Sequence, residues 1–320
     1  MLAASQGDLE RAEAAAAEAL AALETQGDDW EVEATAYTTR AGVASARGAF
    51  TEAIQVLTEG AEVARSAGTA GSKFMAGFML SSAAVSYMMA GNAQAGEPFA
   101  ADAVAIARAT GAPLLIALTL VALAGALAGS DPARARAALD EGLRAEERFG
   151  SKGAPWATYS TLIAARLGDW PLVLRLSVDA LRHLEWSGDR GFTGIAFINV
   201  VARAVAPRDP ESAAVLQGAA RRLALGPTGG SSPGQMIGVD PTSLARDRLA
   251  GPASFMADLR RQATAIVREA IGDHRLGELR AEGEAMDADD AVRYALKVVQ
   301  RNLTALRQEP QIPVPPGDTN

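Results

Sequence analysis

The chain has 320 residues, no cysteine and only two histidines, His183 and His274, which lie far apart in the sequence. This composition excludes disulfide bonds, a thiolate nucleophile and a local zinc motif. Hydrophobic residues make up 49% of the chain and charged residues 21%, which is typical of a protein that folds around a core. We therefore expect a folded chain that holds no metal and no other cofactor.

The net charge of -8 is concentrated at the N-terminal end. Residues 1–70 carry 12 acids and 4 bases, whereas the rest of the chain carries 26 of each. Nucleic-acid binding needs clustered Lys and Arg, so this distribution argues against a direct nucleic-acid partner. The opening residues MLAASQGDLERAEAAAA also lack the apolar segment of a signal peptide. We expect a cytoplasmic protein.

A repeat of about 40 residues organises the first part of the chain. Its turn signals begin at Gly7, Gly48, Gly91, Ser130, Gly168 and Arg208. A second glycine follows each of the first five signals after 20 residues, at Gly27, Gly68, Gly111, Gly150 and Gly188. Such a glycine is typical of the residue that ends a helix in a left-handed conformation. The unit is therefore a helix, a turn, a second helix and a loop.

The first helix of each pair is named A here and the second B. The first B helix, Asp8–Glu24, has only six residues before its turn signal and hence no A partner within the chain. We expect either that Met1 is an internal start within a longer regulator or that another copy of the chain covers this helix. The A helices expected at Phe74–Ala90 and Pro113–Ala128 contain no charged residue, whereas B helices such as Asp131–Phe149 are rich in Arg and Glu.

The segment from Gly111 to Ser130 is uncharged over a length that could span a bilayer. It contains many small residues, and Pro113 and Gly129 limit its helix to about 17 residues, at the short end for a membrane span. The repeat also places an A helix here. We therefore expect a buried helix and no association with a membrane.

Residues 1–225 are thus predicted to form an all-α, tetratricopeptide-like superhelix of helix pairs, because a single pair cannot bury its own apolar face. Residues 226–251 are rich in Gly and Pro and lack a period, so a loop is expected there. A C-terminal helical cap is expected over 252–308, with helices at Pro252–Ile271, His274–Glu282 and Asp287–Arg307. Residues 309–320 are expected to be a disordered tail.

Two strings near the C-terminus carry a more specific pattern, namely AAVLQGAARRLALG at Ala213–Gly226 and AIGDHRLGELRAEGEAMDADDAVRYAL at Ala270–Leu296. They resemble the end of the helical-repeat region in large bacterial regulatory ATPases: the LuxR-type and AfsR-type transcriptional regulators and the cyclase-linked ATPases of actinobacteria. Ile271 and Gly272 stand for the leucine-glycine of the pattern, and Leu276 stands for its usual aromatic residue. The resemblance implies an ATPase module and an effector module, either a cyclase or a DNA-binding domain, upstream of the repeats.

No catalytic motif accompanies these repeats. The string GTAGSKF at Gly68–Phe74 has the wrong spacing for a phosphate-binding loop and joins two helices. His183 and His274 are interpreted as ordinary helix residues. The acids from Glu282 to Asp290 lie where carboxylates cap a helix. We therefore expect the chain not to be an enzyme.

The uncharged A helices supply the candidate binding site. Positions that face the concave side in tetratricopeptide arrays would form an apolar groove, suited to a protein partner or a small apolar ligand. They are Phe78, Ser81, Val85, Met88, Leu120, Ala124, Leu127, Thr158, Leu162, Ile195 and Ile198. The alternative is that these side chains pack in the core.

Two functional classes follow from these observations. The chain is either a sensor or interaction module of a larger signalling protein, or a stand-alone helical-repeat scaffold or inhibitor. An upstream reading frame that encodes a nucleotide-binding module in phase with Met1 would favour the first class. The sequence leaves the oligomeric state open.

Overall fold

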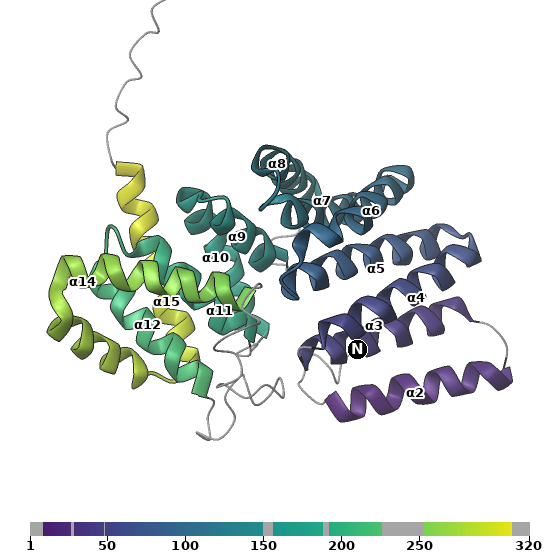
Figure 1. Ribbon diagram of the computed structural model, residues 1–320, viewed down its shortest axis with the longest axis horizontal. Coiled ribbons are helices and arrows are strands. Elements are labelled where there is room, and N and C mark those ends of the chain that lie inside the picture. Colours follow the sequence, from purple (N-terminus) through teal and green to yellow (C-terminus); the bar gives the residue numbers. More distant parts are fainter. Residues whose placement is uncertain are drawn as a thin grey trace, which may run out of the picture.

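The computed structural model describes residues 9–26, 29–47, 49–149, 156–187, 192–225 and 252–308. Within these ranges the chain forms thirteen α-helices and one short 3-10 helix, and no strand. The expected all-α fold class is confirmed. Figure 1 shows the helices following one another in a row, from α2 at one end of the molecule to α12, α14 and α15 at the other.

The helices of the array follow the predicted pairs in chain order. They are α2 (Leu9–Gln26), α3 (Trp30–Ala46), α4 (Phe50–Ala67), α5 (Ala70–Met89), η1 (Ala93–Gly96), α6 (Glu97–Thr110), α7 (Pro113–Leu127), α8 (Pro132–Phe149), α9 (Trp156–Arg166), α10 (Trp170–Ser187), α11 (Phe192–Val205) and α12 (Pro210–Leu225). The cap consists of α14 (Pro252–Glu284) and α15 (Ala288–Gln308). The expected loop over 226–251 and the tail over 309–320 lie outside the described residues.

Two of the predicted helix-ending glycines confirm the repeat. Gly68 follows α4 with φ 68° and Gly111 follows α6 with φ 68°, both in the left-handed region. A residue without Cβ adopts this conformation at little cost, which is why the helices end at these positions. Gly27, Gly150 and Gly188 lie outside the described residues.

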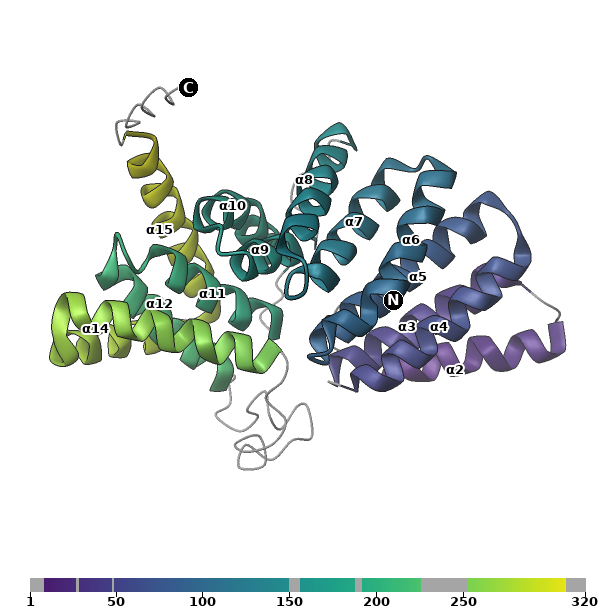
Figure 2. The same ribbon diagram turned by 45° about the horizontal axis from the view of Figure 1, so that its top comes forward.

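The odd-numbered helices form a continuous layer, because α3 contacts α5, α5 contacts α7, α7 contacts α9 and α9 contacts α11. Over the described residues, the even-numbered helices from α4 to α12 make no comparable contacts with one another. This pattern is typical of a curved array in which the odd-numbered layer, the predicted A helices, lies on the inner side. Figure 2 shows the same succession of helices from a second direction.

Helix α7 is the uncharged helix that the sequence places at 113–128. It packs against α5, α6, α8 and α9, and Leu115, Leu120 and Leu127 are fully buried. The expectation of a buried helix in this segment is confirmed. Among the helices formed by the described residues, none combines the length and the apolar character needed to pass through a bilayer.

The C-terminal cap has the helix break that the sequence predicts. The expected helices at Pro252–Ile271 and His274–Glu282 are two parts of α14, separated by a sharp kink at Gly272, where φ is 76° and ψ is 165°. Asp287 caps α15 as expected, since its carboxylate accepts a hydrogen bond of 2.7 Å from the backbone N–H of Asp290. The cap packs back onto the array, because α14 contacts α11 and α12 while α15 contacts α10, α11 and α12.

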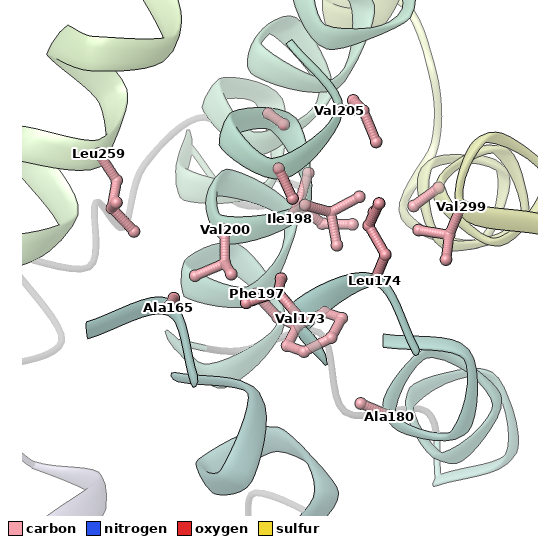
Figure 3. Close-up of a cluster of buried hydrophobic side chains, with 14 of the residues drawn as sticks. Ala165, Val173, Leu174, Ala180, Phe197, Ile198, Val200, Val205, Leu259 and Val299 are labelled. Carbon is pink, nitrogen blue, oxygen red and sulfur yellow. The ribbon is translucent and has the colours of Figure 1, made fainter. Parts of the chain in front are cut away.

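One large core joins the second half of the array to the cap. Figure 3 shows Leu174 of α10 pointing toward Val299 of α15, with Ile198 and Val205 of α11 nearby. Phe197 is completely buried in this cluster. The cap is therefore part of the same hydrophobic core as the repeats and does not form a separate unit.

Helices α12 and α14 touch at two glycines. A Cβ atom built at Gly218 would lie 2.0 Å from the carbonyl oxygen of Arg280, and one built at Gly283 would lie 1.9 Å from that of Val215. These distances leave no room for any side chain, so the two backbones are in direct contact. Both glycines belong to the strings that carry the resemblance to regulatory ATPases.

We predict that Gly218→Ala or Gly283→Ala destabilises the chain by at least about 3 kcal/mol, because the clash is with backbone that no rotamer change relieves. Gly277→Ala is the matched control, since a methyl group at Gly277 of α14 would meet no atom within 4 Å. That substitution should stabilise the helix by about 0.5–1 kcal/mol. Urea unfolding measures all three, and equal stability of the Gly218 and Gly277 variants would contradict the contact.

Asp169 ties α8 to the next pair of helices. Its carboxylate accepts a hydrogen bond of 2.9 Å from the backbone N–H of Leu172, which caps α10, and it also pairs with Arg136 of α8. Partial burial acts to raise the pKa of Asp169, but the Leu172 N–H and the Arg136 guanidinium outweigh it and lower the pKa below its ordinary value. The ionised form is therefore favoured in the folded chain.

We predict that Asp169 stabilises the fold fully above the ordinary carboxyl pKa of about 4, and that this contribution is lost as the pH falls through the lowered pKa. At neutral pH, Asp169→Ala should cost about 1–2 kcal/mol because it removes the cap and the ion pair. Asp169→Asn keeps a capping oxygen and should cost less than about 1 kcal/mol. Thermal unfolding from neutral to acidic pH tests this, and a wild-type advantage over Asp169→Ala that persists undiminished in acid would refute it.

Candidate functional site

The structure corrects most of the predicted groove. Seven of the described candidate side chains are buried in the core and cannot contact a ligand in this structure, namely Ser81, Met88, Leu120, Ala124, Leu127, Thr158 and Ile198. Ile198 and Leu120 belong to the large core that extends to the cap. The side chain of Ile195 lies outside the described residues.

Met88 shows why these positions point inward. A Cβ built at Gly125 of α7 would lie 3.0 Å from the Met88 sulfur and 3.4 Å from Ile163 of α9, so Met88 fills the space between three odd-numbered helices. The candidate residues were chosen by their distance from each turn signal. That choice identified the sides on which neighbouring A helices contact one another, and not the side that faces a ligand. The alternative interpretation, that these side chains pack in the core, is correct for these seven residues.

Phe78, Val85 and Leu162 are the three candidates that remain partly exposed. Phe78 and Val85 lie on α5, and the same side of that helix carries further partly exposed residues at helical spacing. We call this set the α5 face. It comprises Phe74, Phe78, Ser82, Val85 and Met89.

Three members of this face, Phe74, Ser82 and Met89, were not predicted from the sequence. Their spacing of four residues from Phe78 or Val85 was the available signal, because residues four apart lie on one side of a helix. The neighbouring helices border the face: Val85 packs beside Leu123 of α7 in a small cluster of alanines. At the other end, the ring of Trp30 in α3 approaches Gly71, at the start of α5.

Fully exposed large apolar side chains are rare among the described residues. Of the described residues, only Val32 of α3 is a large hydrophobic residue classed as exposed, with 40% of its surface accessible. Partly exposed large apolar side chains also occur on other helices, such as Leu114 and Leu118 of α7, but those of α5 form a row along one side of the helix. Such a row can cover the apolar side of another protein segment.

A second candidate is a polar hollow of about 480 Å³ between the start of α12, the second part of α14 and α15. We call it the α12 hollow. Its wall contains the buried hydroxyl of Ser212, which accepts hydrogen bonds of 3.2 Å from Tyr294 and 2.6 Å from Arg301. Arg301 also pairs with Asp209, and Arg275 lies 3.0 Å from Glu211. Four of the charged groups that line the hollow therefore form ion pairs within the protein.

The side chains that line the α12 hollow indicate which kind of ligand it could hold. The hollow is lined by three arginines, three acids and two hydroxyl-bearing side chains, which does not suit the small apolar ligand expected from the sequence. Asp209 has a second function, because its carboxylate accepts a hydrogen bond of 3.2 Å from the backbone N–H of Ser212 and so caps α12. The network anchors α15 to the array.

The remaining motifs have structural explanations. Thr69 of the string GTAGSKF caps α5 by accepting a hydrogen bond of 3.0 Å from the backbone N–H of Ser72, and Lys73 is exposed. His274 is 91% exposed and lies 3.5 Å from Glu278, one helical turn away. His183 is partly buried on α10.

Comparison with known proteins found no matching family model, no matching curated protein and no matching solved structure.

Burial raises the pKa of Tyr294 above its ordinary value, although the hydrogen bond to Ser212 acts in the opposite direction. We predict that Tyr294 ionises above the ordinary tyrosine pKa of about 10, and that its contribution to stability is lost as the pH rises through the raised value. The chain has four tyrosines, so the difference in ultraviolet absorbance between wild type and Tyr294→Phe isolates this group. Ionisation at or below the ordinary value would contradict the burial of the phenol.

Proposed function

We propose that the chain is a non-catalytic binding module of a larger, signal-responsive bacterial regulator, and that it binds a protein partner through the α5 face. The observation that carries the proposal is the row of partly exposed Phe, Val and Met side chains that runs along one side of α5. Helical-repeat arrays use their inner surface for such contacts.

The α5 face suits an amphipathic helix. Phe74 and Met89 are fifteen residues apart, which corresponds to about 22 Å along a helix axis. A partner helix of about four turns would cover this length with apolar residues at intervals of three and four positions. Phenylalanine supplies a large contact area, and methionine adapts to the shape of its partner.

The resemblance at the C-terminus supports the proposal that the chain is one module of a larger regulator. The strings that resemble regulatory ATPases contain Gly218 and Gly283, at which α12 and α14 touch, so the pattern has a structural meaning in this chain. By analogy with those regulators, the catalytic or DNA-binding step belongs to another module, in a cytoplasmic protein. The analogy concerns architecture and assigns no reaction to these residues.

Site-specific photocrosslinking tests the proposal. A photoreactive phenylalanine analogue replaces Phe78 in the α5 face and, as the control, Glu147 on the exposed side of α8. We predict a crosslinked product of defined mass in the source cell at position 78 and none at position 147. The product should disappear when Val85→Glu is added, because a charge on the apolar face prevents binding.

Circular dichroism of the Val85→Glu variant establishes that the helices remain intact. Products of equal yield at both positions, or a product at position 78 that a correctly folded Val85→Glu variant still forms, would disprove binding through the α5 face.

A further inference from the structure

The two parts of α14 come together with α12 around the side chain of Arg280. Helix α14 turns back on itself at Gly272 (Figure 1), so the Arg280 guanidinium donates a hydrogen bond of 2.7 Å to the hydroxyl of Thr264. In a straight helix these two residues, sixteen positions apart, would be separated by about 24 Å. The kink therefore creates the surroundings of Arg280.

Contacts on both sides hold Arg280 in place. Its backbone lies where α12 and α14 touch, since a Cβ built at Gly218 would lie 2.0 Å from the Arg280 carbonyl oxygen. Its guanidinium also donates a hydrogen bond of 3.0 Å to the side-chain oxygen of Gln217 on α12. Gln217 and Thr264 are both uncharged, so these hydrogen bonds fix the guanidinium without neutralising it.

Three more arginines lie around this position. Arg260 and Arg268 are one helical turn before and after Thr264 on the first part of α14, and Arg221 is one turn after Gln217 on α12. The side chains of all three are exposed. We call these three arginines together with Arg280 the Arg280 cluster.

The electrostatics of Arg280 confirm that the four charges are close together. Burial lowers the pKa of Arg280, and the like charges of the other three arginines lower it further. Glu284 acts in the opposite direction and does not cancel this effect. The folded chain therefore holds the cluster together against repulsion between its members.

Acids neutralise only part of the Arg280 cluster. Arg221 lies 3.1 Å from Glu284, and Arg268 pairs with Asp273 across the kink. Arg260 forms no hydrogen bond or ion pair with another residue that the structure describes. Four arginines and two acids leave an excess of two positive charges at this surface.

The uncharged groups beside Arg280 also lack acceptors. The Nε2 atom of Gln217 is a buried donor without an acceptor among the described residues. The Thr264 hydroxyl accepts from Arg280 and donates to no group in the same part of the chain. The surroundings of Arg280 thus combine excess positive charge with excess hydrogen-bond donors. A phosphomonoester has the complementary chemistry, because it carries about −1.5 to −2 charges at neutral pH and three strong acceptor oxygens.

We propose that the Arg280 cluster binds the phosphate group of a small, soluble phosphomonoester. Guanidinium groups match the geometry of phosphate oxygens, which makes arginine well suited to this ligand. A small ligand fits better than a protein surface, because Arg280 is only partly exposed and lies between helices whose backbones touch. Bound phosphate would connect α12 with both parts of α14. This site is separate from the α5 face, and its test does not depend on a partner there.

Isothermal titration calorimetry tests the proposal on the whole chain. Inorganic phosphate and glycerol 3-phosphate are the probes, and chloride keeps the ionic strength constant. We predict one site per chain, with tighter binding at about pH 7.5 than at about pH 5.5, because the second pKa of phosphate is about 6 and the arginines stay charged. Arg260→Gln should raise the dissociation constant by about fivefold or more. Arg280→Lys should also weaken binding, because it keeps the charge but loses the planar fork.

Arg261→Gln is the matched control. Arg261 is adjacent to Arg260 and also exposed, but it points about 100° away around the helix and pairs with Asp258. The control should leave the dissociation constant unchanged, and thermal unfolding verifies that each variant is folded.

The proposal is overturned if neither probe binds to the wild type, or if folded Arg260→Gln and Arg280→Lys variants bind like the wild type. An equal loss of binding in Arg260→Gln and Arg261→Gln would overturn it too, since only the overall charge would then matter. A phosphoserine peptide that binds where both small probes fail would assign the cluster to a protein partner and reject a small ligand.

Discussion

The direct backbone contact between α12 and α14 determines how the end of this protein is closed. Because Gly218 and Gly283 leave no side chain between the two helices, the second part of α14 is held against the last helix of the array. The first part of α14 then reaches earlier helices: Phe255 lies under the Arg166 guanidinium at 4.7 Å, and Gln262 accepts a hydrogen bond of 3.0 Å from Arg203. With α14 fixed, α15 can pack against α10 and complete the core.

The uncharged helices illustrate the limits of composition as a guide to binding. Both 74–90 and 113–128 lack charge, and α5 and α7 each pack against four other α-helices, yet each helix keeps some large apolar side chains partly exposed. The absence of charge therefore does not tell which side chains of a helix a neighbour covers. An apolar helix becomes a binding surface only where the array leaves one of its sides uncovered.

Sequence alone determined the local features of this protein. The helical periods, the helix ends at Gly68 and Gly111 and the cap at Asp287 depend on conformational preferences within a few residues, and the structure reproduces them. The tertiary structure decided the rest: that Met88 faces α7 while Phe78 stays partly exposed, and that α12 and α14 touch at Gly218 and Gly283. These outcomes depend on contacts between segments distant in the sequence, and a residue type does not reveal which neighbour will cover it.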